Sequence, residues 1–111
     1  MKLPSKVKFV DENLQETFEA LQTGKTEDQE LYQWLERAFN DMEANAFCGI
    51  QIPKKLIPKE YLINYKIHNL WKYDLPKAWR LLYSIENNEI FVISIILEWM
   101  THKKYERKFK Y

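Results

Sequence analysis

The stretch AWRLLYSIENNEIFVISIILEW, from Ala78 to Trp99, decides the fold of this chain. Both arms are rich in β-branched and aromatic residues, and the arm from Ile90 to Trp99 is apolar at nearly every position. That composition is typical of a central strand buried on both faces. Asparagine tolerates positive φ, so Asn87 and Asn88 are expected to form a two-residue hairpin loop. The stretch predicts a β-hairpin of two long strands.

The two-residue loop also predicts the register of the hairpin. It pairs Ile85 with Ile90, Tyr83 with Val92, and Arg80 with Ile95. Arg80 is a fixed cation at the start of an apolar strand, and Glu98 and His102 are expected near it at the end of the next strand. Two readings stay open. Arg80 pairs with Glu98 at the sheet edge, or Arg80, His102 and the surrounding lysines bind an anion.

Length and composition indicate a single domain over residues 1–111. A chain of 111 residues is long enough for one modest core and too short for two. Its many aromatic residues and its few glycines and prolines are typical of a folded globular protein. The tryptophans match the apolar faces of the predicted elements, so they are expected in the core: Trp34, Trp71, Trp79 and Trp99.

The cysteine content and the apolar runs bear on location. One cysteine, Cys48, excludes an internal disulfide and a cysteine-based zinc site, and it fits a reducing cytoplasm. Its expected role is that of a small buried apolar residue. No signal-peptide pattern opens the sequence, and the longest apolar run is too short to cross a bilayer. A cytoplasmic protein without membrane contact is expected.

Charge is divided unevenly along the chain. Residues 1–47 carry five Lys or Arg against ten Asp or Glu, whereas residues 48–111 carry twelve against six. Cations with interleaved Tyr and Trp suit nucleic acid, because cations contact phosphates and rings stack on unpaired bases. A solvated basic surface is the alternative.

The remaining sequence predicts an α+β domain with helices packed on one face of a mainly antiparallel sheet. The predicted order is a strand at Lys6–Val10, a helix capped by Asp11 and ended by Gly24, and a second helix opened by the capping box Thr26–Gln29. A weaker region follows, with a brief strand at Ile50 and Ile52 and a short helix from Pro58 to about Ile67. A strand at Asn69–Leu75, the hairpin and a small C-terminal helix complete the order.

Several classes of site have no sequence signal. The chain has no Gly-rich phosphate loop, and its two histidines, His68 and His102, are not part of any metal-ligand spacing. No serine lies in a nucleophile-elbow pattern. Neither a metal nor a cofactor is therefore expected.

The order β-α-α-β-β-β-α, the strand WRLLY at Trp79–Tyr83 and the HKKYER that begins at His102 resemble the RelE/ParE superfamily of small toxins. The likeness is nearest to the ribosome-dependent mRNA interferase branch around RelE, YoeB and HigB. It covers Val7 to Phe109, with the segment Cys48–His68 longer than usual. The resemblance implies a RelE-like fold, a toxin neutralised by an antitoxin, and mRNA on the ribosome as substrate. A homodimer is left open as its assembly.

The resemblance also implies residue roles. In the family, a ribose 2′-OH attacks the adjacent phosphate, and by position Arg80 matches the arginine that stabilises the resulting charge. His102 matches a histidine that acts as general acid or base, since an imidazole titrates near ~6.5. Tyr105 matches a tyrosine that stacks on a base or supports proton transfer. The RNA-binding lysines implied by position or by charge are Lys54, Lys55, Lys72 and Lys103.

Two features differ from the family pattern. Asp74 stands where RelE-like members often have a second basic residue, and a negative charge near a scissile phosphate opposes cleavage. Glu98 raises the same question, whereas Lys54 and Lys55 of the insertion add positive charge. The alternatives are a ParE-like inhibitor of a topoisomerase, a relative that has lost activity, and a basic surface that binds an acidic peptide of a partner.

Overall fold

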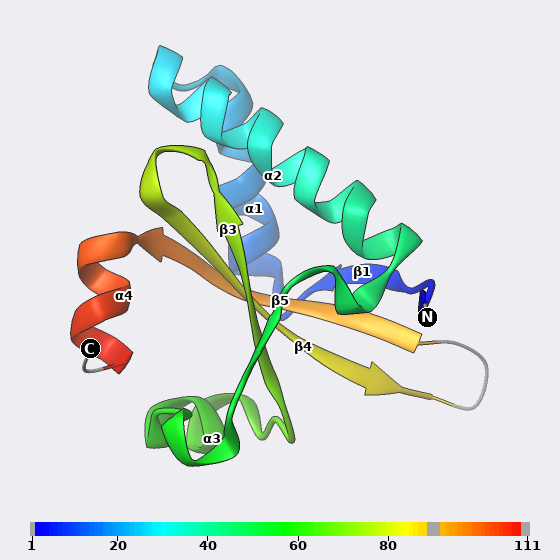
Figure 1. Cartoon of the computed structure of the whole chain (residues 1–111). Coiled ribbons are helices and arrows are strands. Elements are labelled where there is room, and N and C mark those ends of the chain that lie inside the picture. The colour runs from blue at the N-terminus through cyan, green and yellow to red at the C-terminus, as the bar shows by residue number, and fades with distance from the viewer. Residues whose placement is uncertain (1, 89–91, 110–111) are drawn as a thin grey trace.

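The order of elements follows the prediction closely. The computed structural model describes residues 2–88 and 92–109, and within them it contains four α-helices and a five-stranded sheet (Figure 1). The elements are β1 (Lys6–Phe9), α1 (Glu12–Ala20), α2 (Thr26–Ala44), β2 (Ile50–Ile52), α3 (Lys59–Tyr65), β3 (Leu70–Leu75), β4 (Trp79–Asn87), β5 (Val92–Thr101) and α4 (His102–Phe109). The predicted α+β class is confirmed.

The sheet is mixed, with the strand order β1-β5-β4-β3-β2. β1 runs parallel to β5, and the three other neighbouring pairs are antiparallel. β4 and β5 lie in the interior of the sheet, as their continuous apolar sequences require. The brief strand β2 forms one edge and pairs with β3.

The two faces of the sheet carry separate cores because strand side chains alternate. On one face the helical hairpin α1–α2 packs on Leu81, Tyr83 and Ile96. On the other face α3 and α4 pack on Leu70, Leu82 and Met100 through three aromatic residues, Tyr61, Tyr105 and Phe109. The prediction that the helices pack on one face of the sheet is therefore wrong. Figure 1 shows α1 and α2 together, away from α3 and α4.

The tryptophans and β3 follow the predicted pattern. All four tryptophans pack against the core on the α1–α2 face. In β3, Trp71, Tyr73 and Leu75 contribute to that same core, whereas Leu70 belongs to the core on the other face. Lys72 and Asp74 share the face of Leu70, which places two charged side chains on the α4 side of the sheet.

The predicted register of the hairpin is wrong. Tyr83 pairs with Ile96 and not with Val92, Arg80 pairs with Met100 and not with Ile95, and Ile85 pairs with Ser94. Ile90, its predicted partner, lies outside the described residues. Asn87 is the last residue of β4 and pairs with Val92, so the connection is longer than two residues. A bulge between Leu82 and Tyr83 moves the register by one further position.

The helix ends match the capping signals of the sequence to within one or two residues. Asp11 caps α1, since its Oδ1 accepts from the backbone N of Leu14 at 2.8 Å. The capping box of α2 is shifted by one residue: Lys25 is the N-cap, and Asp28 Oδ2 accepts from its backbone N at 3.1 Å. The short helix α3 begins after Pro58 as predicted and ends at Tyr65, two residues before the predicted end, with Lys66 as its C-cap at φ 53°.

Candidate functional site

Arg80 and His102 meet on the α4 face of the sheet. Arg80 Nη2 lies 3.1 Å from His102 Nδ1, and Arg80 Nε lies 3.1 Å from Asp74 Oδ1. Arg80 is the second residue of β4, Asp74 is its cross-strand partner in β3, and His102 is the first residue of α4, directly after β5. The side chain of Arg80 is only 16% exposed, whereas that of Asp74 is 49% exposed. The guanidinium therefore lies under a partly open carboxylate.

These contacts assign the proton of His102. A guanidinium only donates, so Nδ1 of His102 must accept with its lone pair. Nε2 lies 2.6 Å from Oε1 of Glu106, one helical turn later, and donates its proton there. The imidazole is neutral in this arrangement, and both of its nitrogens are engaged.

Lys72 and Tyr105 complete the cluster in different ways. Lys72 Nζ lies 3.3 Å from Asp74 Oδ1 and 5.6 Å from the centre of the Tyr105 ring. The Tyr105 ring is roughly parallel to the imidazole of His102 at 6.5 Å and stacks on Phe109 at 4.4 Å. Tyr105 is 0% exposed, so its ring packs beneath the site and does not face solvent. Stacking of an RNA base on Tyr105 would require this core to open.

Of the two readings left open for Arg80, the ion pair with Glu98 is not formed. Glu98 lies opposite Leu82 and pairs with Lys108 at 3.3 Å and with Lys104 at 3.9 Å. Lys108 also contacts Glu60 of α3 at 3.4 Å. The lysines of α4 engage Glu98, whereas Arg80 is engaged by Asp74 and His102.

The other predicted lysines are dispersed. Lys103 is exposed on the first turn of α4, next to His102. Lys54 and Lys55 lie in a 3-10 turn before α3, and Lys55 lines a hollow with Lys108 and Phe109 at the far end of α4. An eight-residue helix is about 12 Å long, so this pair is not part of the Arg80 cluster.

Sequence reasoning missed Glu106. The signal was present, since His102 and Glu106 have the i, i+4 spacing that brings two side chains together on one helix face. It could only be read once the start of α4 was known. Asp74 was noted as an exception to the family pattern, but its contact with Arg80 depends on the pairing of β3 with β4.

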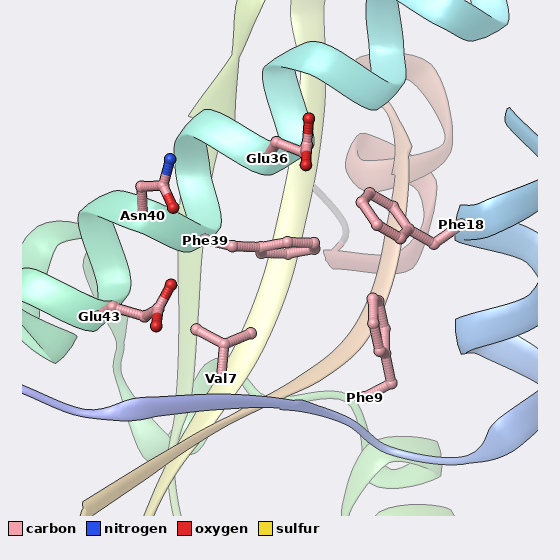
Figure 2. Close-up of a pocket in the computed structure, with 7 residues that line it drawn as sticks. All are labelled: Val7, Phe9, Phe18, Glu36, Phe39, Asn40 and Glu43. Atoms are coloured by element: carbon pink, nitrogen blue, oxygen red, sulfur yellow. The ribbon is translucent and has the colours of Figure 1, made fainter. Parts of the chain in front are cut away.

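A second hollow lies on the opposite side of the sheet, between α2 and β1 (Figure 2). Its volume is about 260 Å³, and Phe9, Phe18 and Phe39 converge on it. Glu36 and Glu43 of α2 also line it, and they carry negative charge. This hollow has the wrong charge for a phosphate and contains none of the predicted site residues.

Residues 2–88 and 92–109 were also compared with the requirements of a metal site, a cysteine nucleophile and a membrane-spanning helix. No group of three or more His, Cys, Asp or Glu side chains there is arranged to hold a metal ion. Burial raises the pKa of the Cys48 thiol, which disfavours the nucleophilic thiolate. No helix in the same residues is long and apolar enough to span a bilayer.

Comparison with known proteins adds no assignment. No protein-family model, no curated protein and no solved structure matches this chain.

Proposed function

We propose that this chain is a RelE-like toxin that cleaves mRNA on the ribosome, with Arg80 and His102 at the site of cleavage. The observation that carries the proposal is the 3.1 Å contact between these two side chains, which come from distant points of the sequence. The order β1, α1, α2, then β3, β4, β5 and α4 is also the order on which the family resemblance rests.

The proposed reaction is metal-independent transfer within the RNA backbone. The ribose 2′-oxygen forms a bond to the adjacent phosphorus and loses its proton, and the 5′-oxygen of the next nucleotide leaves and gains one. The products are a 2′,3′-cyclic phosphate and a 5′-hydroxyl. Arg80 binds two phosphate oxygens and stabilises the charge that grows on them in the transition state.

His102 acts as the base in this scheme. When a phosphate takes the Nη2 donor of Arg80, the lone pair on His102 Nδ1 becomes free to accept the 2′-OH proton. Glu106 keeps the second proton on Nε2 and stabilises the imidazolium that forms. Tyr105 supports the imidazole from below, and Lys72 and Lys103 add positive potential.

A second candidate function follows from Asp74. Its carboxylate occupies the guanidinium that a phosphate would need, which favours a relative of the same fold without nuclease activity. Such a chain would act by protein contact, as a ParE-like inhibitor of a topoisomerase or as an interaction module. The two candidates differ in whether RNA is cut.

The family resemblance also implies the partners and the cellular location of this chain. The partners are an antitoxin protein and mRNA on the ribosome, the location is the cytoplasm, and the chain needs no cofactor. A homodimer is compatible with the proposal and is not required by it.

Arg80→Ala tests the proposal directly. Expression of the wild-type chain in bacteria is expected to arrest growth and to produce new mRNA 5′ ends in primer extension. Arg80→Ala is expected to lower the cleavage rate by about 100-fold or more, because it removes the main stabiliser of transition-state charge. Arg37→Ala on α2 is the matched control and should keep full activity.

Circular dichroism and a thermal melt should show that both variants remain folded. If Arg80→Ala arrests growth as the wild type does, the assignment of Arg80 is wrong. If the wild type leaves mRNA intact and instead traps cleaved plasmid in a supercoiling assay, the ParE-like candidate replaces the nuclease.

A further inference from the structure

The insertion between β2 and β3 exposes an unusual amount of apolar surface. Among the described residues, five large apolar side chains are exposed, and three of them lie between β2 and β3: Leu56, Leu62 and Ile63. Ile63 is 72% exposed. The neighbouring Tyr61 is 1% exposed and anchors α3 to the core, so the exposure belongs to a folded and packed helix. Exposed apolar side chains that gather in one place mark a contact surface.

This apolar surface continues into a hollow of about 640 Å³ between the N-terminal end of α3 and the C-terminal end of α4. Leu56, Ile57 and Phe109 contribute apolar lining, and the charged lining residues are three lysines and one acid: Lys55, Lys59, Lys108 and Glu60. The volume is in the range of pockets that take large side chains or ligands of drug size.

Lysines border both parts of the surface. Lys59 is three and four residues before Leu62 and Ile63, so these side chains share the solvent side of α3. Segment 53–66 holds four lysines against one acid, Glu60, whose carboxylate lies 3.4 Å from Lys108. Within residues 2–88 and 92–109, no ion pair engages Lys55 or Lys59, which leaves their charges open to a partner.

We propose that this α3 surface, defined by Leu56, Leu62, Ile63, Lys55 and Lys59, binds an acidic amphipathic helix of a partner protein. The apolar side of that helix packs on the leucines and the isoleucine and places one large side chain in the hollow, and its carboxylates pair with the lysines. Charge complementarity sets the choice of an acidic partner.

The chemistry of the surface disfavours two other anionic partners. Single-stranded RNA stacks its bases on aromatic rings, whereas the exposed apolar side chains of this surface are aliphatic. Helices that bind membrane surfaces carry long apolar faces, often with Trp or Phe, whereas the seven residues of α3 span only about 10 Å. A flat bilayer would also leave the hollow unfilled.

A synthetic helix tests the proposal with the full chain. The probe is a fluorescein-labelled peptide of about 14 residues with Leu at i, i+3, i+4 and i+7 and Glu at most other positions. Fluorescence anisotropy should show saturable binding that weakens with added salt. Lys59→Glu and Ile63→Ser should each weaken binding by about tenfold or more.

Matched controls test whether binding depends on this surface or only on the net charge and the apolar area of the whole chain. Lys25→Glu in the α1–α2 loop and Ile50→Ser in β2 change exposed residues elsewhere and should leave affinity unchanged. A peptide with Lys in place of Glu should not bind. The proposal would be overturned if every protein variant bound the peptide equally well. It would also be overturned if a peptide with Gln in place of Glu bound more tightly.

Two further outcomes would also overturn it. One is that the wild-type chain does not bind the acidic peptide but binds phosphatidylglycerol vesicles, and that Ile63→Ser abolishes the vesicle binding. The other is concentration-dependent self-association that Ile63→Ser abolishes, which would make a second copy the occupant. None of the substituted residues belongs to the Arg80 cluster, so these results do not depend on the proposed nuclease function.

Discussion

At the residue scale, Asp74 is the residue that we expect to limit the binding of a phosphate by Arg80. Its carboxylate lies 3.1 Å from Arg80 Nε and 3.3 Å from Lys72 Nζ, so one half-exposed acid engages two cations of the candidate site. Asp74→Asn keeps the shape and removes the charge. We expect this variant to bind a non-cleavable RNA, with a 2′-deoxy position at the cut, about threefold to tenfold more tightly.

Glu16→Gln is the matched control for Asp74→Asn, because it removes one exposed carboxylate from α1, on the other side of the sheet. Its affinity for RNA should stay at the wild-type value. Equal gains in the two variants would mean that net charge governs binding and that the contact with Arg80 does not.

At the element scale, the turn after α2 is locked to the sheet by Tyr83. Tyr83 Oη donates to the carbonyl of Ala46 at 2.7 Å and accepts from the backbone N of Gly49 at 3.0 Å. A Cβ on Gly49 would collide with the carbonyl oxygen of Lys72 in β3 and with this hydroxyl. The close approach of two backbones requires a glycine here.

Gly49→Ala is therefore expected to lower the free energy of unfolding by about 1–3 kcal/mol, as overpacking does in other cores. Urea denaturation followed by tryptophan fluorescence measures the change. Gly24→Ala is the comparison, because its Cβ would meet the side chain of Asp28 at an exposed helix cap and not the backbone of a neighbouring strand. A loss at Gly49 no larger than at Gly24 would contradict the proposed lock.

At the scale of the whole molecule, both cores contain groups that hold their protons more tightly when folded. Burial, followed by the neighbouring carboxylate of Glu98, raises the pKa of Tyr61, and burial is also the main cause that raises the pKa of Tyr83. Burial lowers the pKa of Lys108, but its contacts with Glu98 and Glu60 outweigh this and the net shift is upward.

These shifts predict alkaline unfolding. Unfolded tyrosine and lysine titrate near ~10 and the folded groups titrate higher, so their contribution to stability is complete below pH ~10 and is lost as pH rises further. The urea midpoint should stay level from pH 7 to 9 and then fall, together with a rise in tyrosinate absorbance. Tyr61→Phe should make the fall less steep. A midpoint that rises above pH 10 would contradict the assignment.

The sequence by itself determined which residues form helices and strands and which strand faces are apolar. Periodicity and caps act over a few residues, so the order of elements, the cap at Asp11 and the two faces of β3 were predictable. The α+β class followed from that order. Neither the register of paired strands nor the side-chain contacts across them can be read from such short-range signals.

Only the tertiary structure decided what surrounds Arg80. The length of the β4–β5 connection and the bulge at Leu82 set the register, and the register places Arg80 opposite Met100 and next to His102. The pairing of β3 with β4 added Asp74. Charged side chains reach only a few ångströms, so one shift of register exchanges every partner of a cation, although the pattern of apolar residues stays the same.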